Sequence, residues 1–149
     1  MKYVEMLYQL AVSFWAGGYA LFTFVLTPML FKAESRDSAG RIVGILFPGY
    51  FRWGLACGAV ALVCRLVLRG GRIELASIIL VAMLTITAFQ AFYVEPKAAE
   101  IKKGIVSFDT TPKDHPLRRE FSKLHGISAL CNLTVIIGGV ALVLIPLKR

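Results

Sequence analysis

Several residue types and motifs that indicate familiar chemistry are rare or absent in this 149-residue sequence. It has only two histidines, His115 and His125, and three cysteines, none of them in a Cys-x-x-Cys pair. These are too few ligands for an ordinary zinc site, and we expect no metal site. The sequence also has no glycine-rich phosphate loop and no nucleophile elbow, so it gives no sign of nucleotide binding or of serine hydrolase chemistry.

Acidic residues are scarce as well, with nine Asp and Glu against 17 Lys and Arg. Carboxylate catalysis could therefore draw only on Glu95 or on acids of the loops, and we lean against an enzyme. A basic excess can indicate a nucleic-acid partner, but these basic residues form short clusters between long uncharged runs, unlike those of a soluble basic domain. We expect them to contact lipid headgroups and expect no nucleic-acid partner.

Apolar residues are abundant. Hydrophobic residues make up 57% of the chain, above the 45–50% usual in soluble domains, and long stretches such as Met6–Phe31 and Leu75–Val94 carry no charge. We predict one domain, residues 1–149, that is an all-α integral membrane four-helix bundle with antiparallel transmembrane helices. The predicted spans are about residues 6–31, 42–68, 74–94 and 117–147, with a polar connection at 95–116.

Prolines and glycines predict where these spans are irregular. The first helix should end around Pro28, and Gly44, Pro48 and Gly49 indicate that the second span begins with a kinked or interfacial segment.

Small residues continue deeper in the second span. Gly54 and Gly58 form a GxxxG step that allows another helix backbone to approach closely. Cys57 and Cys64 are about 10 Å apart along the same helix, too far for a disulfide, so we interpret them as buried structural thiols.

Four spans place both termini on one side of the membrane and the two longer loops on the other. Basic residues occur on both sides, so the orientation and the identity of the membrane stay open. Polar residues of the spans gather toward the side of the longer loops. We predict that a polar funnel enters the bundle there. Its ligand-binding residues would be Arg52, Gln90, Tyr93, Glu95, His125, Ser128 and Asn132.

The fourth span carries the most regular part of this funnel. His125, Ser128 and Asn132 follow i, i+3, i+7 spacing, which places them on one helix face, with Asn132 about 10 Å deeper than His125. Such groups need hydrogen-bond partners where water is absent, so they either bind a ligand or tie the helices together.

Arg52 is the residue of the second span that is least favourable in the bilayer. An arginine that faces lipid at mid-bilayer costs roughly 2.5 kcal/mol or more. It either faces the funnel as an anion receptor that can pair with Glu95, or extends to headgroups beside Trp53.

His125 also allows a redox hypothesis, in which it carries protons, ligates haem b or a metal, or donates a hydrogen bond to a quinone. A haem held by two histidines would need His125 from two subunits, or His115 folded inward, because the chain has no other histidine.

The sequence resembles the transmembrane protein 205-like family, which is also catalogued as a domain of unknown function. The shared motifs are Trp15 to Gly18; Thr27, Pro28 and Phe31; Ala39 and Gly40; Phe47 to Tyr50; Tyr93 and Pro96; and Phe121, Leu124, His125, Ser128 and Asn132. The resemblance implies a four-helix membrane protein and suggests that the FPGY turn at 47–50 and the His125 face belong to one site. The four-helix haem-linked protoporphyrinogen oxidases fit less well, because the first helix here has no histidine.

We therefore predict a multi-pass integral membrane protein that binds or transports a small polar or amphipathic ligand in the funnel. The alternatives are a membrane redox protein that binds haem b or a quinone through His125, and a structural or regulatory membrane component without a ligand. Membrane lipid is the expected partner. Homo-oligomerisation is also expected, because four short helices make a thin pore.

Overall fold

The computed structural model describes residues 1–69 and 75–145, and all regular structure within these residues is helical. In chain order the elements are α1 (Lys2–Leu21), the π-helix η1 (Phe22–Leu26), α2 (Thr27–Ala33), α3 (Arg36–Arg69), α4 (Leu75–Phe89), the π-helix η2 (Gln90–Val94), α5 (Glu95–Lys103) and α6 (Pro116–Leu144). The predicted all-α fold class is confirmed.

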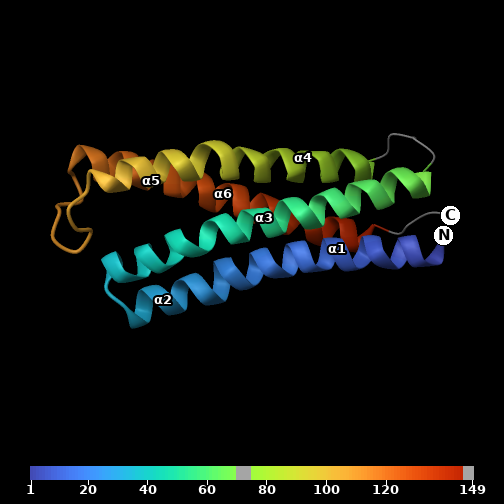
Figure 1. Ribbon diagram of the computed structural model, residues 1–149, viewed down its shortest axis with the longest axis horizontal. Coiled ribbons are helices and arrows are strands. Elements are labelled where there is room, and N and C mark those ends of the chain that lie inside the picture. Colours follow the sequence, from blue (N-terminus) through green and yellow to red (C-terminus); the bar gives the residue numbers. More distant parts are fainter. Residues whose placement is uncertain (70–74, 146–149) are drawn as a thin grey trace.

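These elements form four long antiparallel rods, because α1, η1 and α2 run on as one helix, as do α4, η2 and α5 (Figure 1). The α1 rod packs against α3 and α6, and α4 packs against the same two helices, so α1 and α4 lie diagonally across the bundle. α1 begins and α6 ends at the same end of the bundle, which we call the terminal end. The connections 34–35 and 104–115 lie at the other, which we call the loop end.

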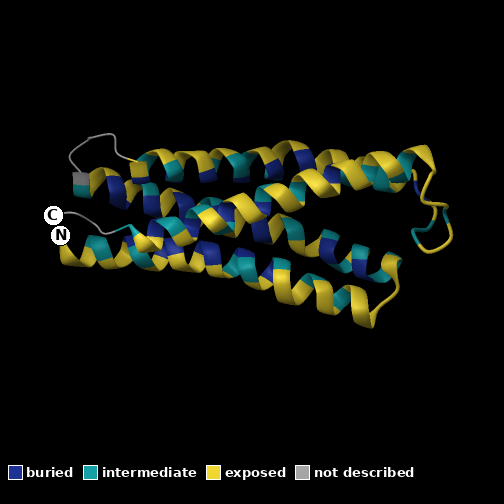
Figure 2. Ribbon diagram, turned by 180° about the vertical axis from the view of Figure 1, so that it is seen from behind, coloured by how far each residue is buried: buried dark blue, intermediate teal, exposed yellow. Residues whose placement is uncertain are grey.

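All four rods are long and apolar enough to cross a membrane. Large hydrophobic side chains cover their outer faces, among them Phe24, Ile45, Phe92, Leu130 and Ile137 (Figure 2). A soluble protein buries such residues, whereas a lipid bilayer solvates them. The protein is thus a multi-pass helical membrane protein.

The third rod shows where the bilayer ends. Leu75–Val94 contains 20 residues without a charge and is about 30 Å long, which matches the hydrocarbon thickness. The charged helix α5 then continues for about 13 Å beyond it. The boundary therefore lies near Val94 and Glu95, and the loop end projects past it. The first nine residues of the predicted polar connection 95–116 are helical. Position 74 and positions 146–147 of the predicted spans lie outside the described residues.

Each π-helix ends two residues before a proline, Pro28 or Pro96. The Thr27 N–H donates to the Phe22 carbonyl and the Glu95 N–H to the Gln90 carbonyl, each five residues back. Proline lacks an N–H and its ring clashes with the carbonyl four residues earlier, so a wider turn accommodates it without ending the helix. The expectation that the first helix ends around Pro28 is wrong, since the helix reaches Ala33.

The second rod is one helix of 34 residues with Pro48 inside it. Figure 1 shows α3 as an unbroken ribbon. The FPGY segment at 47–50 is therefore helical, and it is neither a turn nor a separate interfacial start to the span.

Candidate ligand-binding cavity

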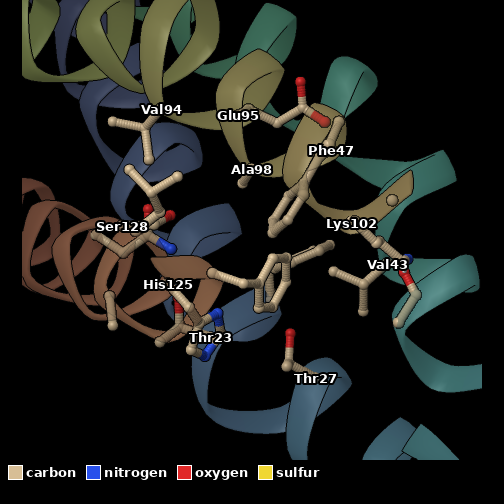
Figure 3. Close-up of a pocket in the computed structure, with 18 of the residues that line it drawn as sticks. Thr23, Thr27, Val43, Phe47, Val94, Glu95, Ala98, Lys102, His125 and Ser128 are labelled. Carbon is tan, nitrogen blue, oxygen red and sulfur yellow. Dashed lines mark hydrogen bonds between the residues drawn. The ribbon is translucent and has the colours of Figure 1, made fainter. Parts of the chain in front are cut away.

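A cavity of about 450 Å³ lies between the rods at the loop end (Figure 3). This volume is within the range of small-molecule sites. Its wall is mostly apolar and rich in aromatic rings. The larger apolar lining residues are Phe22, Phe31, Val43, Phe47, Phe51, Val94, Phe108, Phe121 and Leu124. The polar and charged lining residues are Thr23, Thr27, Arg36, Glu95, Lys102, His125, Ser128 and Asn132.

The two π-helices place the cavity at the bilayer boundary. Phe22 and Thr23 come from η1 and Val94 from η2, while Thr27 and Glu95 follow directly after these turns. Because Val94 and Glu95 mark the end of the hydrocarbon layer, the cavity extends from the headgroup region into the bilayer.

The deep end of the cavity, which we call the floor, consists of Gln90, Ser128 and Asn132. Gln90 is 0% exposed, and its Oε1 accepts a hydrogen bond of 3.0 Å from the Ser128 hydroxyl. Asn132 is 7% exposed and lines the cavity. Within residues 1–69 and 75–145, neither Gln90 Nε2 nor Asn132 Oδ1 has a hydrogen-bond partner. A buried polar group left unpaired costs about 1–3 kcal/mol, so the floor has unused capacity to bind a polar group.

The opposite end is covered by the connection between α5 and α6, and we call Asp37, Ser107, Phe108 and Asp109 the roof. The Asp37 carboxylate accepts hydrogen bonds from the Ser107 hydroxyl at 2.5 Å and the Phe108 N–H at 2.6 Å. The Asp109 carboxylate in turn accepts from the Arg36 and Asp37 N–H groups. These reciprocal bonds attach the connection to the first turn of α3.

Two further sets of contacts fix the roof to the helices. Lys102 Nζ donates to the Gly40 carbonyl at 2.8 Å, which joins α5 to α3. The Phe108 ring packs edge-on against Phe121 of α6, with centroids 4.8 Å apart, and the Arg118 guanidinium lies over the Phe108 ring, 5.7 Å from its centroid. The roof therefore contacts α3 and α6, and the Lys102 bond joins α5 to α3 beside it.

The side of the cavity between α2 and α6 is its mouth. Phe31 of α2 and His125 of α6 both line the cavity and are both exposed. The His125 ring is nearly parallel to that of Phe121, with centroids 6.4 Å apart. Met29 and Ile127 beside them are exposed and apolar, so the mouth opens on the lateral, lipid-facing surface.

The structure brings together five of the seven predicted site residues. Glu95, His125, Ser128 and Asn132 line the cavity, and Gln90 joins them through Ser128.

Arg52 and Tyr93 lie elsewhere. Arg52 is exposed on the outer face of α3, because it is one residue, or about 100°, away from the inward-facing Phe51. At this level its long side chain can extend to the headgroups, and no Arg52–Glu95 ion pair occurs. Tyr93 is exposed on α4's continuation, where it stacks on Phe89 at 5.3 Å and lies under Lys97.

Sequence reasoning missed the charged lining residues Lys102 and Arg36. A signal for Lys102 was present. Once the helix continues through Pro96, Glu95, Ala98 and Lys102 follow i, i+3, i+7 spacing and share one face. Arg36 and Phe108 reach the cavity only through the fold of the two connections, which no periodicity predicts.

Phe47 and His125 both line the cavity, as the resemblance suggested for the FPGY segment. Tyr50 instead stacks on Tyr19 at 4.2 Å and Phe22 at 4.4 Å, below the cavity wall.

His125 is the only histidine at the cavity. His115 is the N-cap of α6, ten residues or about 15 Å earlier along the helix. One chain therefore does not present both histidines to opposite sides of one haem. In the described part of the chain, no group of three or more His, Cys, Asp or Glu side chains is placed to hold a metal ion.

Comparisons with known proteins place the chain in a family. The profile of DUF4149, a domain of unknown function, matches residues 10–107. An uncharacterized protein of Aquifex aeolicus (strain VF5) is 31% identical over 126 residues, which are 85% of this chain and 83% of that protein. No solved structure matches the chain. The matched range spans α1 to α5, the helices that supply both π-helices of the cavity. The chain belongs to the DUF4149 family.

Proposed function

We propose that this protein binds an amphipathic molecule that enters the loop-end cavity from the bilayer. The observation that carries the proposal is the cavity itself, which combines aromatic walls, a hydrogen-bonding floor and a lateral mouth at the bilayer boundary. We also propose that the DUF4149 family and the transmembrane protein 205-like proteins are related, on the motifs shared along the chain.

An amphipathic ligand fits the wall better than a small polar one. Apolar ligand surface that leaves water for a wall of Phe22, Phe47 and Phe51 gains roughly 25 cal/mol per Å². A small polar solute would gain nothing from these rings and would lose its own hydration.

The packing below the floor favours binding over passage through one chain. The core of the terminal half is filled by buried side chains, among them Trp15, Met83 and Val135. The funnel is therefore closed at its deep end. Homo-oligomerisation stays a prediction, because nothing in a single chain tests it.

Quinones belong to the proposed ligand class, since their rings suit the aromatic wall and their carbonyls can accept hydrogen bonds. His125 supports this redox alternative because it lines the mouth. A haem at His125 would give the purified protein a Soret band that is lost in His125→Ala, and a colourless preparation from haem-replete cells would contradict it.

Paired glycine variants test the binding proposal. Gly44 lines the cavity, and a Cβ there would meet only Lys102 Nζ, at 3.9 Å. Gly44→Leu should therefore place a side chain in the cavity without a clash, and the better helix propensity of leucine should offset small strains. Gly49→Leu is the matched control, because Gly49 is on the same helix, outside the lining, with nothing within 4 Å.

The measurement is native mass spectrometry of protein released from gently solubilised membranes. We expect wild type and Gly49→Leu to retain a bound amphipathic mass that Gly44→Leu loses. Equal retention by all three proteins would contradict binding in the cavity, and the absence of any adduct would favour a structural role without a ligand.

A further inference from the structure

We infer that the cavity floor binds an uncharged hydroxyl head group, so that the ligand is a long-chain alcohol held with its head toward Asn132. This inference rests on the proposed function and specifies the ligand class. The side chains that recognise the head are Ser128 and Asn132, supported from behind by Gln90.

The two floor residues that line the cavity, Ser128 and Asn132, offer it hydrogen-bond acceptors, whereas the unpaired donor Gln90 Nε2 belongs to a residue outside the lining. Ser128 donates its only hydrogen to Gln90 Oε1, which leaves the lone pairs of its oxygen free to accept. Asn132 Oδ1 is buried and has no partner among the described residues. Because Ser128 and Asn132 are four residues apart on α6, they lie on one face as neighbours. A ligand at this place must bring a donor of its own.

The comparison with Thr134 shows that Asn132 is not satisfied by its own helix. Thr134 is exposed on the outer face, and its Oγ1 donates to the Leu130 carbonyl of its own helix at 2.9 Å. A hydroxyl that faces lipid needs such a partner because no water is present there. Asn132, two residues earlier, is 7% exposed and keeps an unpaired oxygen beside a cavity. The amide is therefore directed to something other than the helix backbone.

The charges of the cavity lie away from the floor. Figure 3 shows Ser128 and Lys102 on opposite sides of the cavity, with Glu95 apart from both. Lys102 Nζ already binds the Gly40 carbonyl, and Arg36 lies at the start of α3 under the roof. A carboxylate or phosphate head at the floor would have no cation there. An ammonium would be removed from water with no anion beside it.

A hydroxyl meets these conditions. It donates one hydrogen, to Asn132 Oδ1 or Ser128 Oγ, and accepts one from the Asn132 amide N–H group, without carrying a charge into the bilayer. The alkyl chain then lies along Phe22, Phe47 and Phe51 and leaves through the mouth beside Phe31 and His125.

The test is a competition experiment in lipid nanodiscs with the full chain. A dodecan-1-ol carrying a diazirine in its chain is photolysed with the protein, and labelled peptides are quantified by mass spectrometry. Dodecan-1-ol, dodecylamine, dodecanoate and dodecane are the competitors. We expect dodecan-1-ol to compete about tenfold better than dodecane, the factor that one net hydrogen bond supplies.

Variants locate the head group. Asn132→Leu removes the unpaired oxygen at nearly constant volume, and Ser128→Ala removes the second acceptor with a smaller change. Asn132→Leu should reduce the preference for alcohol over dodecane to about onefold, and Ser128→Ala should reduce it less, because the Asn132 amide remains. Thr134→Val on the lipid-facing side of α6 should leave it unchanged.

Two results would overturn the inference but leave the proposed function standing. The first is equal competition by dodecane and dodecan-1-ol, which would mean that the floor recognises no head group. The second is stronger competition by dodecanoate or dodecylamine than by the alcohol. If no probe labels peptides that line the cavity, the proposed function itself fails.

Discussion

The interior glycines of the two halves of the bundle have different surroundings. At the terminal end, a Cβ on Gly58 would lie 2.5 Å from Leu84 Cδ2 and 2.7 Å from Trp15 Cη2, and one on Gly139 would lie 2.5 Å from Ala16 Cβ. At the loop end, a Cβ on Gly44 would have its nearest neighbour at 3.9 Å, and one on Gly49 would have none within 4 Å. The interior glycines Gly58 and Gly139 thus permit close contact in the terminal half, whereas Gly44 leaves room beside the cavity at the loop end.

The contrast shows how a small membrane bundle can contain a cavity. Helices in lipid associate through close packing of small residues, and the terminal half supplies that packing with Trp15 and Tyr19 seated on Gly54 and Gly58. In the loop half, hydrogen bonds instead attach the connection 104–115 to Asp37 in the first turn of α3. The rods can therefore stay apart around a cavity without losing their register.

Gly139→Leu should have the largest effect. The new side chain would overlap Ala16 of α1, and the backbones cannot separate without losing the contacts around them. We expect a loss of about 3 kcal/mol in the free energy of unfolding, the upper range for overpacked cores. Denaturant titration of the protein in mixed micelles measures it.

Gly49→Leu is the control for that variant, because it makes the same chemical change where no neighbour is present. Its stability should stay within about 0.5 kcal/mol of wild type. Equal losses in both variants would show that overlap with Ala16 is not what destabilises Gly139→Leu.

Asp37→Ala should have an intermediate and local effect. It removes the acceptor for the Ser107 hydroxyl and the Phe108 N–H, so the roof should open more often while the terminal half is unchanged. We expect amide hydrogen exchange in 104–115 to accelerate about tenfold or more, with exchange in α1 unaltered.

Asp114→Ala is the matched control, since Asp114 is an exposed acid of the same connection. It should leave the exchange rates as in wild type. Unchanged protection of Phe108 in Asp37→Ala would mean that the roof is held by Phe108 packing on Phe121 alone.

Pro96→Ala should have the smallest effect. A proline inside a regular helix costs about 3 kcal/mol, but the π-helix Gln90–Val94 already accommodates this ring. We expect the free energy of unfolding to change by less than about 1 kcal/mol. A gain near 3 kcal/mol, measured by the same titration, would show that the turn is strained.

Much of the fold could be predicted because charge-free runs of bilayer length leave few alternatives. The four rods, the antiparallel order and the gathering of Gln90, Glu95, His125, Ser128 and Asn132 at one end follow from hydropathy and helical spacing. The GxxxG step at Gly54 and Gly58 predicts close approach of a helix backbone, but the nearest atoms there belong to side chains, chiefly those of Trp15 and Tyr19 of α1.

The remainder depends on rotations that a sequence does not reveal. Arg52 and Tyr93 are each one or two residues from an inward-facing position, and a step of one residue turns a side chain by about 100°. The π-helices before Pro28 and Pro96 change the direction in which the following side chains point, and they let each helix continue past its proline. The continued third rod carries Lys102 to the cavity. The roof depends on contacts between residues about 70 positions apart.

The most direct test of a ligand-filled cavity is the change in melting temperature when lipid is removed from wild type, Gly44→Leu and Gly49→Leu. A ligand at 100 times its Kd stabilises the folded state by about 2.7 kcal/mol. We predict that delipidation lowers the melting temperature of wild type and Gly49→Leu by several degrees more than that of Gly44→Leu, whose cavity is already filled by its own side chain. Equal losses in all three proteins would contradict the account.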